Sequence, residues 1–276
     1  MKMIDRRSFV QEAAKVAGGG TIIFGSTFKV SLAKNAPSNP VLGVKALFFD
    51  MFGTILDWRT GVAHSVEKIL KPLGYSLDWF EFADEWRSLY GPGMEEVRSG
   101  RTPYVSLDAV HRRMLDKVMA RFEIRGLPDK VMEDINLSWH RLDVWPDVAN
   151  ALPRLHSKFL LAPVSNANIS MIANVVRRNN ISFDAVLGAD IARDFKPKAI
   201  VYQASAEAFA LEPEQCMLVS AASHNVDMKG AASAGLKVAA IERPDEHGAG
   251  KSSVTPKVPV DMLAKDLNDL ANQLGV

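Results

Sequence analysis

The chain has 276 residues, of which 47% are hydrophobic and 24% are charged, with 33 basic and 32 acidic side chains. This composition is typical of a globular protein with a sizeable core, and it excludes a disordered chain, a collagen-like repeat and a coiled-coil rod. The net charge near zero argues against a nucleic acid as a partner. The single cysteine, Cys216, excludes an internal disulfide and a paired-cysteine metal site.

The first 40 residues form a basic leader, with six basic and two acidic side chains. The paired arginines Arg6 and Arg7 precede a moderately apolar stretch at 17–28, which is too short and too rich in glycine for a membrane anchor. This pattern resembles a twin-arginine export signal, and 35–40 resembles a linker. We therefore predict a periplasmic protein that meets the export translocon and has no stable membrane insertion. If the leader is instead a helix of the mature fold or a disordered tail, the protein is cytoplasmic.

Five short apolar runs behind the leader predict β-strands. Each is short enough for a buried strand, and they lie at 44–49, 159–164, 185–187, 217–219 and 238–241. Helical patterns separate the later runs, for example at 199–209 and 227–234. Buried strands that alternate with helices favour an α/β fold with a doubly wound, parallel, Rossmann-like sheet.

The interval between the first two predicted strands is long and helical in pattern. Its apolar residues recur at helical spacing, most clearly from Leu107 to Phe122, and no strand pattern interrupts them. We therefore predict a helical cap inserted into the α/β core. The expected organisation is a leader and linker at 1–40, a core at 41–57 and 143–276, and a cap at 58–142.

Polar side chains follow the first, second and fourth predicted strands, and a lysine lies in the segment between the third and the fourth. In an open parallel sheet, ligands bind beyond the carboxyl ends of the strands, so these side chains are expected to converge. Taken alone, each is more typical of a turn or a helix cap, but their order and placement indicate an active site. They comprise carboxylates, hydroxyls, an amide, an imidazole and a lysine: Asp50, Thr54, Ser165, Asn166, Lys196, Ser223, His224 and Asp227.

These motifs resemble those of the haloacid dehalogenase (HAD) superfamily, and within it the L-2-haloacid dehalogenases (haloacid dehalogenase type II). The resemblance extends over 44–276 and implies a HAD core with an inserted cap. In the core it rests on FFDMFGT at 48–54, SNA at 165–167, FKP at 195–197 followed by Tyr202, and SHNVD at 223–227. In the cap it rests on WRSLY at 86–90 and VRSGRTPYVSLDAVHRRML at 97–115.

The resemblance implies a hydrolase that converts (S)-2-haloalkanoic acids to 2-hydroxyalkanoic acids. Asp50 would displace the halide and form an ester with the substrate. Lys196 would keep the Asp50 carboxylate ionised, and the hydroxyls of Thr54 and Ser165 would donate hydrogen bonds to it or to the substrate. Asp227 would organise the water that attacks the ester.

The other candidate residues are expected to contact the substrate or the second carboxylate. Arg87 of the cap would bind the substrate carboxylate or the leaving halide, and Asn166 would help to polarise the carbon–halogen bond. Ser223 and His224 would orient the second carboxylate, and Tyr202 would complete the lining. Simpler roles remain open for two of them, because Arg87 has Glu85 as a possible surface partner and His224 suits a buried hydrogen bond.

Phe52 is a further expected substrate contact, and it separates two activities of the superfamily. It lies two residues after Asp50, where the phosphatases carry an acid that protonates the leaving alcohol. Phenylalanine donates no proton, and a halide needs none because it leaves as a stable anion. Dehalogenases most often have tyrosine at this position, asparagine in place of His224 and an aromatic residue in place of Val226.

Other functions stay open at this level. A Mg²⁺-dependent phosphatase is compatible with the two carboxylates Asp50 and Asp227, and a related hydrolase acting on another small carboxylic acid would use the same nucleophile. A binding protein of this fold would need neither the nucleophile nor the lysine. The dehalogenase interpretation implies no metal and no cofactor. Its partners are a 2-halo carboxylic acid and water, with a homodimer as an open possibility.

Overall fold

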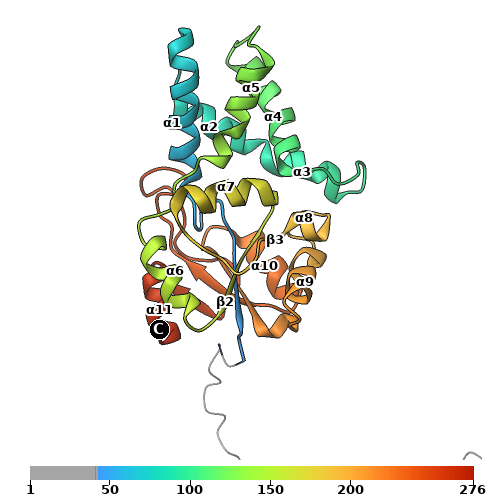
Figure 1. The fold of residues 1–276 in the computed structure, drawn as a ribbon, viewed down its shortest axis with the longest axis vertical. Helices are drawn as coiled ribbons and strands as arrows, with labels where there is room; N and C mark the ends of the chain where they lie inside the picture. The colour runs from blue at the N-terminus through green and yellow to red at the C-terminus, as the bar shows by residue number, and fades with distance from the viewer. Residues whose placement is uncertain (1–40, 42) are drawn as a thin grey trace, which may run out of the picture. The chain divides into compact units, whose positions relative to one another are not determined.

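The computed structural model describes residue 41 and residues 43–276, and the predicted leader lies outside this part. Within it, six strands form one parallel sheet in the order β3-β2-β1-β4-β5-β6 (Figure 1). The strands are β1 (Ala46–Phe49), β2 (Leu160–Ser165), β3 (Leu187–Gly188), β4 (Cys216–Ala221), β5 (Lys237–Ile241) and β6 (Met262–Ala264). The predicted α/β fold is confirmed. None of the predicted strands corresponds to β6.

The central strand β1 is apolar on both faces because helices cover both faces of the sheet. Leu47 and Phe49 point into a core that they share with α6 (Val148–His156), α7 (Ile169–Asn179) and α11 (Leu267–Leu274). Ala46 and Phe48 point to the other face, into a core shared with α9 (Ala199–Ala208) and α10 (Asn225–Ser233). All four side chains are fully buried, which explains a continuous apolar run instead of an alternating one.

The insertion between β1 and β2 is helical, as predicted. It contains α1 (Trp58–Leu70), η1 (Lys71–Leu73), α2 (Trp79–Ser88), α3 (Tyr90–Arg98), α4 (Leu107–Arg121), α5 (Asp129–Asn136) and η2 (Leu137–His140). Side-chain caps start three of these helices: Asp57 accepts from Thr60, Asp78 from Phe80 and Glu81, and Ser106 from Ala109. Figure 1 shows α1–α5 together beyond one end of the sheet. The domain bounds themselves stay a prediction.

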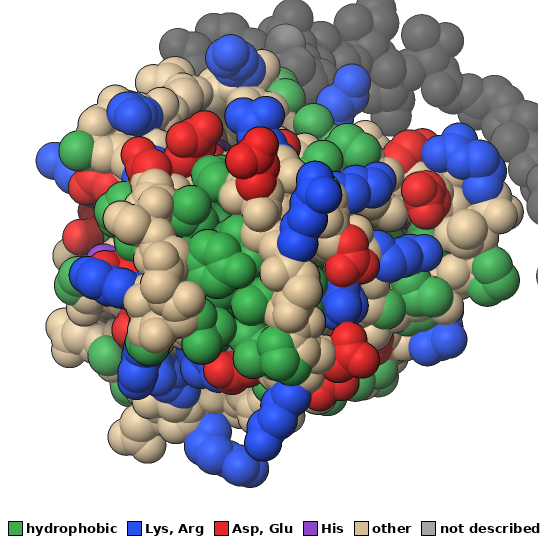
Figure 2. Space-filling view, turned by 90° about the horizontal axis from the view of Figure 1, so that it is seen from above, with side chains coloured by type: hydrophobic (Ala, Val, Ile, Leu, Met, Phe, Trp, Pro, Cys, Tyr) green, Lys and Arg blue, Asp and Glu red, His purple; other side chains and the backbone are tan. Residues whose placement is uncertain are grey.

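The helices of the insertion pack into the apolar core that also covers the Leu47 and Phe49 face of the sheet. Seen from the cap side, apolar side chains gather near the centre of the face, and charged side chains of both signs surround them (Figure 2). The remaining short elements, α8 (Ala189–Ala192) and η3 (Pro213–Gln215), lie in the core domain. Across the described residues, no helix combines the length and the apolar character that a bilayer crossing requires.

Polar contacts join the cap to the core at several points. The Asn168 amide donates to the Asp108 carboxylate at 2.8 Å, and the Tyr104 hydroxyl donates to Asp190 at 2.6 Å. Arg98 donates to the backbone carbonyl of Lys196 at 2.9 Å. These contacts hold the start of α4 and the end of α3 against the loops that follow β2 and β3.

Candidate active site

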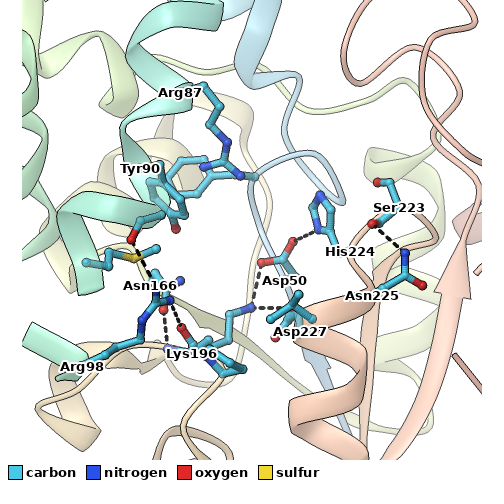
Figure 3. Close-up of a pocket in the computed structure, with 15 residues that line it drawn as sticks. Asp50, Arg87, Tyr90, Arg98, Asn166, Lys196, Ser223, His224, Asn225 and Asp227 are labelled. Carbon is cyan, nitrogen blue, oxygen red and sulfur yellow. Dashed lines mark hydrogen bonds and ion pairs between the residues drawn. The ribbon is translucent and has the colours of Figure 1, made fainter. Parts of the chain in front are cut away.

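A cavity of about 500 Å³ lies between the cap and the carboxyl ends of the strands. Its walls combine the turn after β1, helices α2 and α3 of the cap and the loops after β2 and β4 (Figure 3). The lining residues include most of the candidates from the sequence: Asp50, Phe52, Arg87, Asn166, Lys196, Ser223, His224 and Asp227. The lining also includes Tyr90, Gly91, Met94, Arg98, Pro197, Asn225 and Val226.

The Asp50 carboxylate lines this cavity and lies between two cationic groups. The Lys196 ammonium donates to its Oδ1 at 2.8 Å, and the Nδ1 atom of His224 lies 3.0 Å from its Oδ2 (Figure 3). Burial alone would raise the pKa of Asp50, but the charges of Lys196 and His224 outweigh it and hold that pKa well below its usual range. Asp50 is therefore an ionised carboxylate that faces the cavity.

Thr54 fixes the orientation of the same carboxylate. Its hydroxyl donates to Oδ2 of Asp50 at 2.9 Å and accepts from the backbone N–H of Ala221 at 2.8 Å. Because the hydroxyl accepts from Ala221, its single proton is directed toward Asp50. Ser165 makes no hydrogen bond to Asp50: its Oγ accepts from the backbone N–H of Ala167 at 3.1 Å, and it is fully buried outside the cavity lining. The predicted hydrogen bond from Ser165 to the substrate stays a prediction.

The second carboxylate, Asp227, is held by three side chains. Lys196 donates to its Oδ2 at 2.7 Å, Tyr202 donates to its Oδ1 at 2.6 Å, and Ser220 donates to Oδ2 at 3.3 Å. The prediction that Ser223 and His224 orient Asp227 is therefore wrong. Both of those residues instead contact Glu246, a carboxylate that was not among the predicted site residues.

Tyr202 is also a correction. The sequence analysis placed it in the substrate lining, but it is fully buried, lies outside the cavity wall and contacts Asp227. Burial and the negative charge of Asp227 raise the pKa of the Tyr202 hydroxyl far above its usual range, so the hydroxyl stays a donor. It acts on the site through Asp227.

The residue that the sequence analysis missed is Glu246, in the loop after β5. Its buried carboxylate lies 2.8 Å from Nε2 of His224 and accepts from the Ser223 hydroxyl at 2.8 Å and from the Trp58 indole at 3.3 Å. Burial raises the pKa of Glu246, but His224 outweighs this and lowers the pKa to about 2. Burial also opposes a charge on His224, yet Glu246 and Asp50 raise its pKa to about 10.

Arg87 faces the cavity with an unused donor. Its guanidinium carbon lies 4.0 Å from the ring centroid of Tyr90, 5.3 Å from Trp58 and 5.7 Å from Phe52. Its buried Nη1 has no hydrogen-bond partner within the described structure. The alternative surface pair with Glu85 is wrong, because Glu85 pairs with Arg121 at 3.3 Å. A cation with a free donor in a cage of rings can bind an anion.

Asn166 and Phe52 shape the wall beside Arg87. The Asn166 carbonyl accepts from the backbone N–H of Lys196 at 2.7 Å, and its side chain also hydrogen-bonds the Tyr90 hydroxyl. Phe52 is 2% exposed and packs edge-on against Tyr90 and Trp139. No acidic group occupies its position, so this side of the cavity offers no carboxylic acid to a leaving group.

The donor set does not suit a divalent metal. Lys196 contacts both Asp50 and Asp227, at 2.8 and 2.7 Å, so its ammonium occupies the position between the two carboxylates that a cation would need. Across the described residues, no group of three or more His, Cys, Asp or Glu side chains is arranged to hold a metal ion. Lys196 supplies the positive charge beside the two carboxylates.

Comparisons with known proteins agree with this architecture. The sequence profile of a hydrolase family, the haloacid dehalogenase-like hydrolases, matches residues 44–235. The chain belongs to this family. Within it, solved structures that resemble the chain include the defluorinating L-2-haloacid dehalogenase Rha0230, with 35% identity and a TM-score of 0.81 over 84% of this chain and 96% of that one. The L-2-haloacid dehalogenase PA0810 also has 35% identity, with a TM-score of 0.79 over 84% and 98%.

Relatives of lower identity are named for two different activities. The (S)-2-haloacid dehalogenase of Xanthobacter autotrophicus is 27% identical over 80% of this chain and 84% of its own length. A phosphoglycolate phosphatase of Aliivibrio fischeri is 24% identical over 79% of this chain and 92% of its own. The choice between them depends on the chemistry of the site.

Proposed function

We propose that the protein hydrolyses (S)-2-haloalkanoic acids to 2-hydroxyalkanoic acids, with Asp50 as the nucleophile. The observation that carries this proposal is an ionised carboxylate between Lys196 and His224, with phenylalanine at position 52 where a phosphatase needs an acid. A halide leaves as an anion and needs no proton. The relatives of highest identity reported above are named as L-2-haloacid dehalogenases, which supports the same reaction.

The reaction begins with substrate binding beside Arg87. The free Nη1 donor and the surrounding rings suit an anion, either the substrate carboxylate or the departing halide. Asp50 attacks the halogen-bearing carbon in line, an Asp50–carbon bond forms, and the carbon–halogen bond breaks with its electron pair on the halide. In-line attack inverts the configuration at that carbon. Water then cleaves the ester at the Asp50 carbonyl carbon.

The test is a panel of 2-haloacids assayed beside a panel of phosphate esters, each in excess EDTA and in added Mg²⁺. We expect halide release from the haloacids that is unchanged by EDTA and not raised by Mg²⁺, because Lys196 already provides the cation that the carboxylates need. Phosphate release that requires Mg²⁺, without halide release, would favour the phosphatase. Turnover of neither panel would favour a related hydrolase of another small carboxylic acid.

A single turnover in ¹⁸O-labelled water identifies the nucleophile. Because water attacks the ester at Asp50, the label is expected in the Asp50 side chain and not in the product of the first turnover. Peptide mass spectrometry of the segment that contains Asp50 measures this. Label found only in the 2-hydroxy acid would mean that water attacks the substrate directly and that Asp50 acts as a general base.

We also propose that residues 1 to about 33 direct export and are removed, which rests on Arg6, Arg7 and the basic leader. Intact-mass measurement of protein from the periplasm tests this, with an Arg6→Lys, Arg7→Lys double variant as the control that should stay in the cytoplasm. Recovery of the full-length chain from the cytoplasm alone would contradict the proposal. The homodimer stays a prediction, which sedimentation of the mature protein tests.

A further inference from the structure

The two oxygens of the Asp50 carboxylate have different partners. Oδ2 accepts from two donors, the Thr54 hydroxyl at 2.9 Å and His224 Nδ1 at 3.0 Å. Oδ1 accepts from Lys196 at 2.8 Å and from no other donor in the described part of the chain. Oδ1 therefore keeps a lone pair for attack on carbon, whereas both lone pairs of Oδ2 are engaged. Attack through Oδ1 leaves Oδ2 as the carbonyl oxygen of the ester.

His224 has a carboxylate at each ring nitrogen. Nδ1 lies 3.0 Å from Asp50 and Nε2 lies 2.8 Å from Glu246. A neutral imidazole would set its unprotonated nitrogen against one of these anions, whereas the imidazolium donates to both. Glu246 is itself 1% exposed and fixed by Ser223 and Trp58, so the pair is held in one geometry.

We propose that Thr54 and the His224 imidazolium form an oxyanion hole that acts in the second half of the reaction, and that Glu246 is the positioning residue that keeps His224 charged. The inference rests on the proposed ester mechanism. Its geometric basis is that both donors already lie 2.9–3.0 Å from the oxygen on which negative charge appears when water attacks the ester.

The steps balance with groups that line the cavity. Water gives a proton to Asp227, and its oxygen bonds to the Asp50 carbonyl carbon while an electron pair moves onto Oδ2. When that pair returns, the bond from the carbonyl carbon to Oδ1 breaks. Oδ1 leaves with the 2-hydroxy acid and takes the proton back from Asp227. The new carboxyl group of Asp50, which contains Oδ2 and the water oxygen, releases its proton to solvent.

The charges around the site favour a role for these donors in the second half of the reaction. Before reaction, Lys196 is shared by Asp50 and Asp227, and His224 is shared by Asp50 and Glu246. Ester formation neutralises Asp50, so Lys196 and His224 each keep a single carboxylate partner. A transition state with an oxyanion at Oδ2 gives His224 a second anionic partner again, so the site binds it more tightly than the ester itself. His247 adds a distant contact to Glu246 at 3.7 Å.

A general base is the other role that histidine commonly has. That role requires an unprotonated nitrogen next to the water, and both nitrogens of His224 face anions in this structure. The two roles differ in the sign of their pH dependence. An imidazolium donor loses activity as the pH rises through its pKa, whereas a general base gains activity there.

The experiment follows a single turnover of (S)-2-chloropropionate by rapid quench, measuring chloride and, by intact mass, the ester on Asp50. In His224→Ala we expect one chloride per active site, followed by ester hydrolysis that is slowed about 10²- to 10³-fold more than ester formation is. His156→Ala, which removes an exposed histidine paired with Asp184 far from the cavity, is the matched control and should behave as the wild type.

The pH profile of ester hydrolysis separates the roles without relying on a disruptive variant. In the wild type we expect the rate of ester hydrolysis to fall as the pH rises. The midpoint of this fall should lie below about 10, the pKa of His224 before the reaction, because the ester lacks the Asp50 charge that helps to raise this pKa. Glu246→Gln removes the other anion and should move this falling limb to lower pH. A limb that rises instead, or ester hydrolysis at the normal rate in His224→Ala, would overturn the inference. Failure of the wild type to release chloride or form the ester would overturn the proposed function itself, and the inference with it.

Discussion

At the scale of single residues, Arg87 is the cap side chain with the clearest role in the cavity. Its guanidinium is stacked on Tyr90, lies near Trp58 and Phe52, and leaves Nη1 buried without a partner. A buried donor without a hydrogen bond is costly, so an anion that accepts from it gains binding energy. The rings that surround it hold the guanidinium in one orientation toward the cavity.

Replacing Arg87 by alanine should reduce kcat/KM for 2-haloacids by at least about 100-fold, because a charge-assisted hydrogen bond and its preorganisation are lost together. Steady-state chloride release measures this. Arg121→Ala, which removes the surface pairs with Glu81 and Glu85, is the control and should retain activity. An Arg87→Ala enzyme with normal kcat/KM would contradict the assignment of Arg87 to anion binding.

The sequence identified most of the site residues but not all of their contacts. Asp50, Lys196 and Asp227 could be found because each follows a strand or a recognisable motif. Glu246 carries no motif, yet the same argument extended to the end of the fifth predicted strand would have drawn attention to the acidic segment at 242–246. The roles of Tyr202 and Ser165 could not be predicted, because hydrogen-bond partners depend on side-chain orientations that spacing does not determine.

At the scale of elements, the turn after β1 connects the nucleophile to the Glu246 loop. Gly53 has φ = +87°, and a Cβ atom there would lie 2.2 Å from the Glu246 carboxylate oxygen. The Trp145 indole also donates to the Gly53 carbonyl at 3.0 Å. The turn therefore requires glycine for two separate reasons, its backbone conformation and the close approach of Glu246.

Gly53→Ala should displace Glu246 and with it His224, so we expect lower stability and a large loss of activity. Gly74→Ala is the matched control, because Gly74 has φ = +92° but nothing within 4 Å of the added carbon. Both variants should lose about 1 kcal/mol of unfolding free energy from backbone strain, and only Gly53→Ala should lose chloride release. Equal activities in the two variants would show that the approach of Glu246 is unimportant.

The elements that the sequence analysis missed or misplaced are short. The strand β6 is a three-residue apolar run, Met262–Ala264, that follows a long loop and has one half-exposed side chain. The strand β3 has two residues and ends in Gly188, beyond the predicted 185–187 run. Longer elements such as α4 were predicted within a residue or two, because seven of its side chains are buried at helical spacing.

At the scale of the whole molecule, the buried charges link stability to pH. The pKa of His224 is raised from its usual 6.5 to about 10, so folding stabilises the protonated form. This contribution is fully present below pH 6.5 and is lost as the pH rises towards 10. The pKa of His111 is lowered to about 3, so this group affects stability mainly below pH 6.5. The pKa of Cys216 is raised to about 12, so this group affects stability mainly above pH 9.

We therefore expect the free energy of unfolding to fall by about 2 kcal/mol between pH 7 and pH 9, since each pKa unit corresponds to about 1.4 kcal/mol. Urea denaturation at the two pH values measures this. In His224→Gln the difference should largely disappear, whereas His156→Gln, the exposed control, should keep it. A wild-type stability that is constant or rising over this window would contradict a charged, buried His224.

The strand order could not be predicted from the sequence, although the class of fold could. Alternating strands and helices indicate a parallel sheet, but the position of each strand depends on which side of β1 the chain returns to. The cap was predictable only as an insertion. Its placement over the cavity depends on contacts such as that of Asn168 with Asp108, between residues about 60 apart in the chain.

The central place of β1 has a consequence for how the chain folds as it is made. Ala46 pairs with Leu160 on one side and with Cys216 on the other, roughly 110 and 170 residues later. During synthesis the first strand to leave the ribosome therefore waits for both neighbours until most of the chain has emerged. Such distant pairing slows folding and exposes an apolar strand edge in the meantime. The sheet can close around β1 only after β4 has left the ribosome.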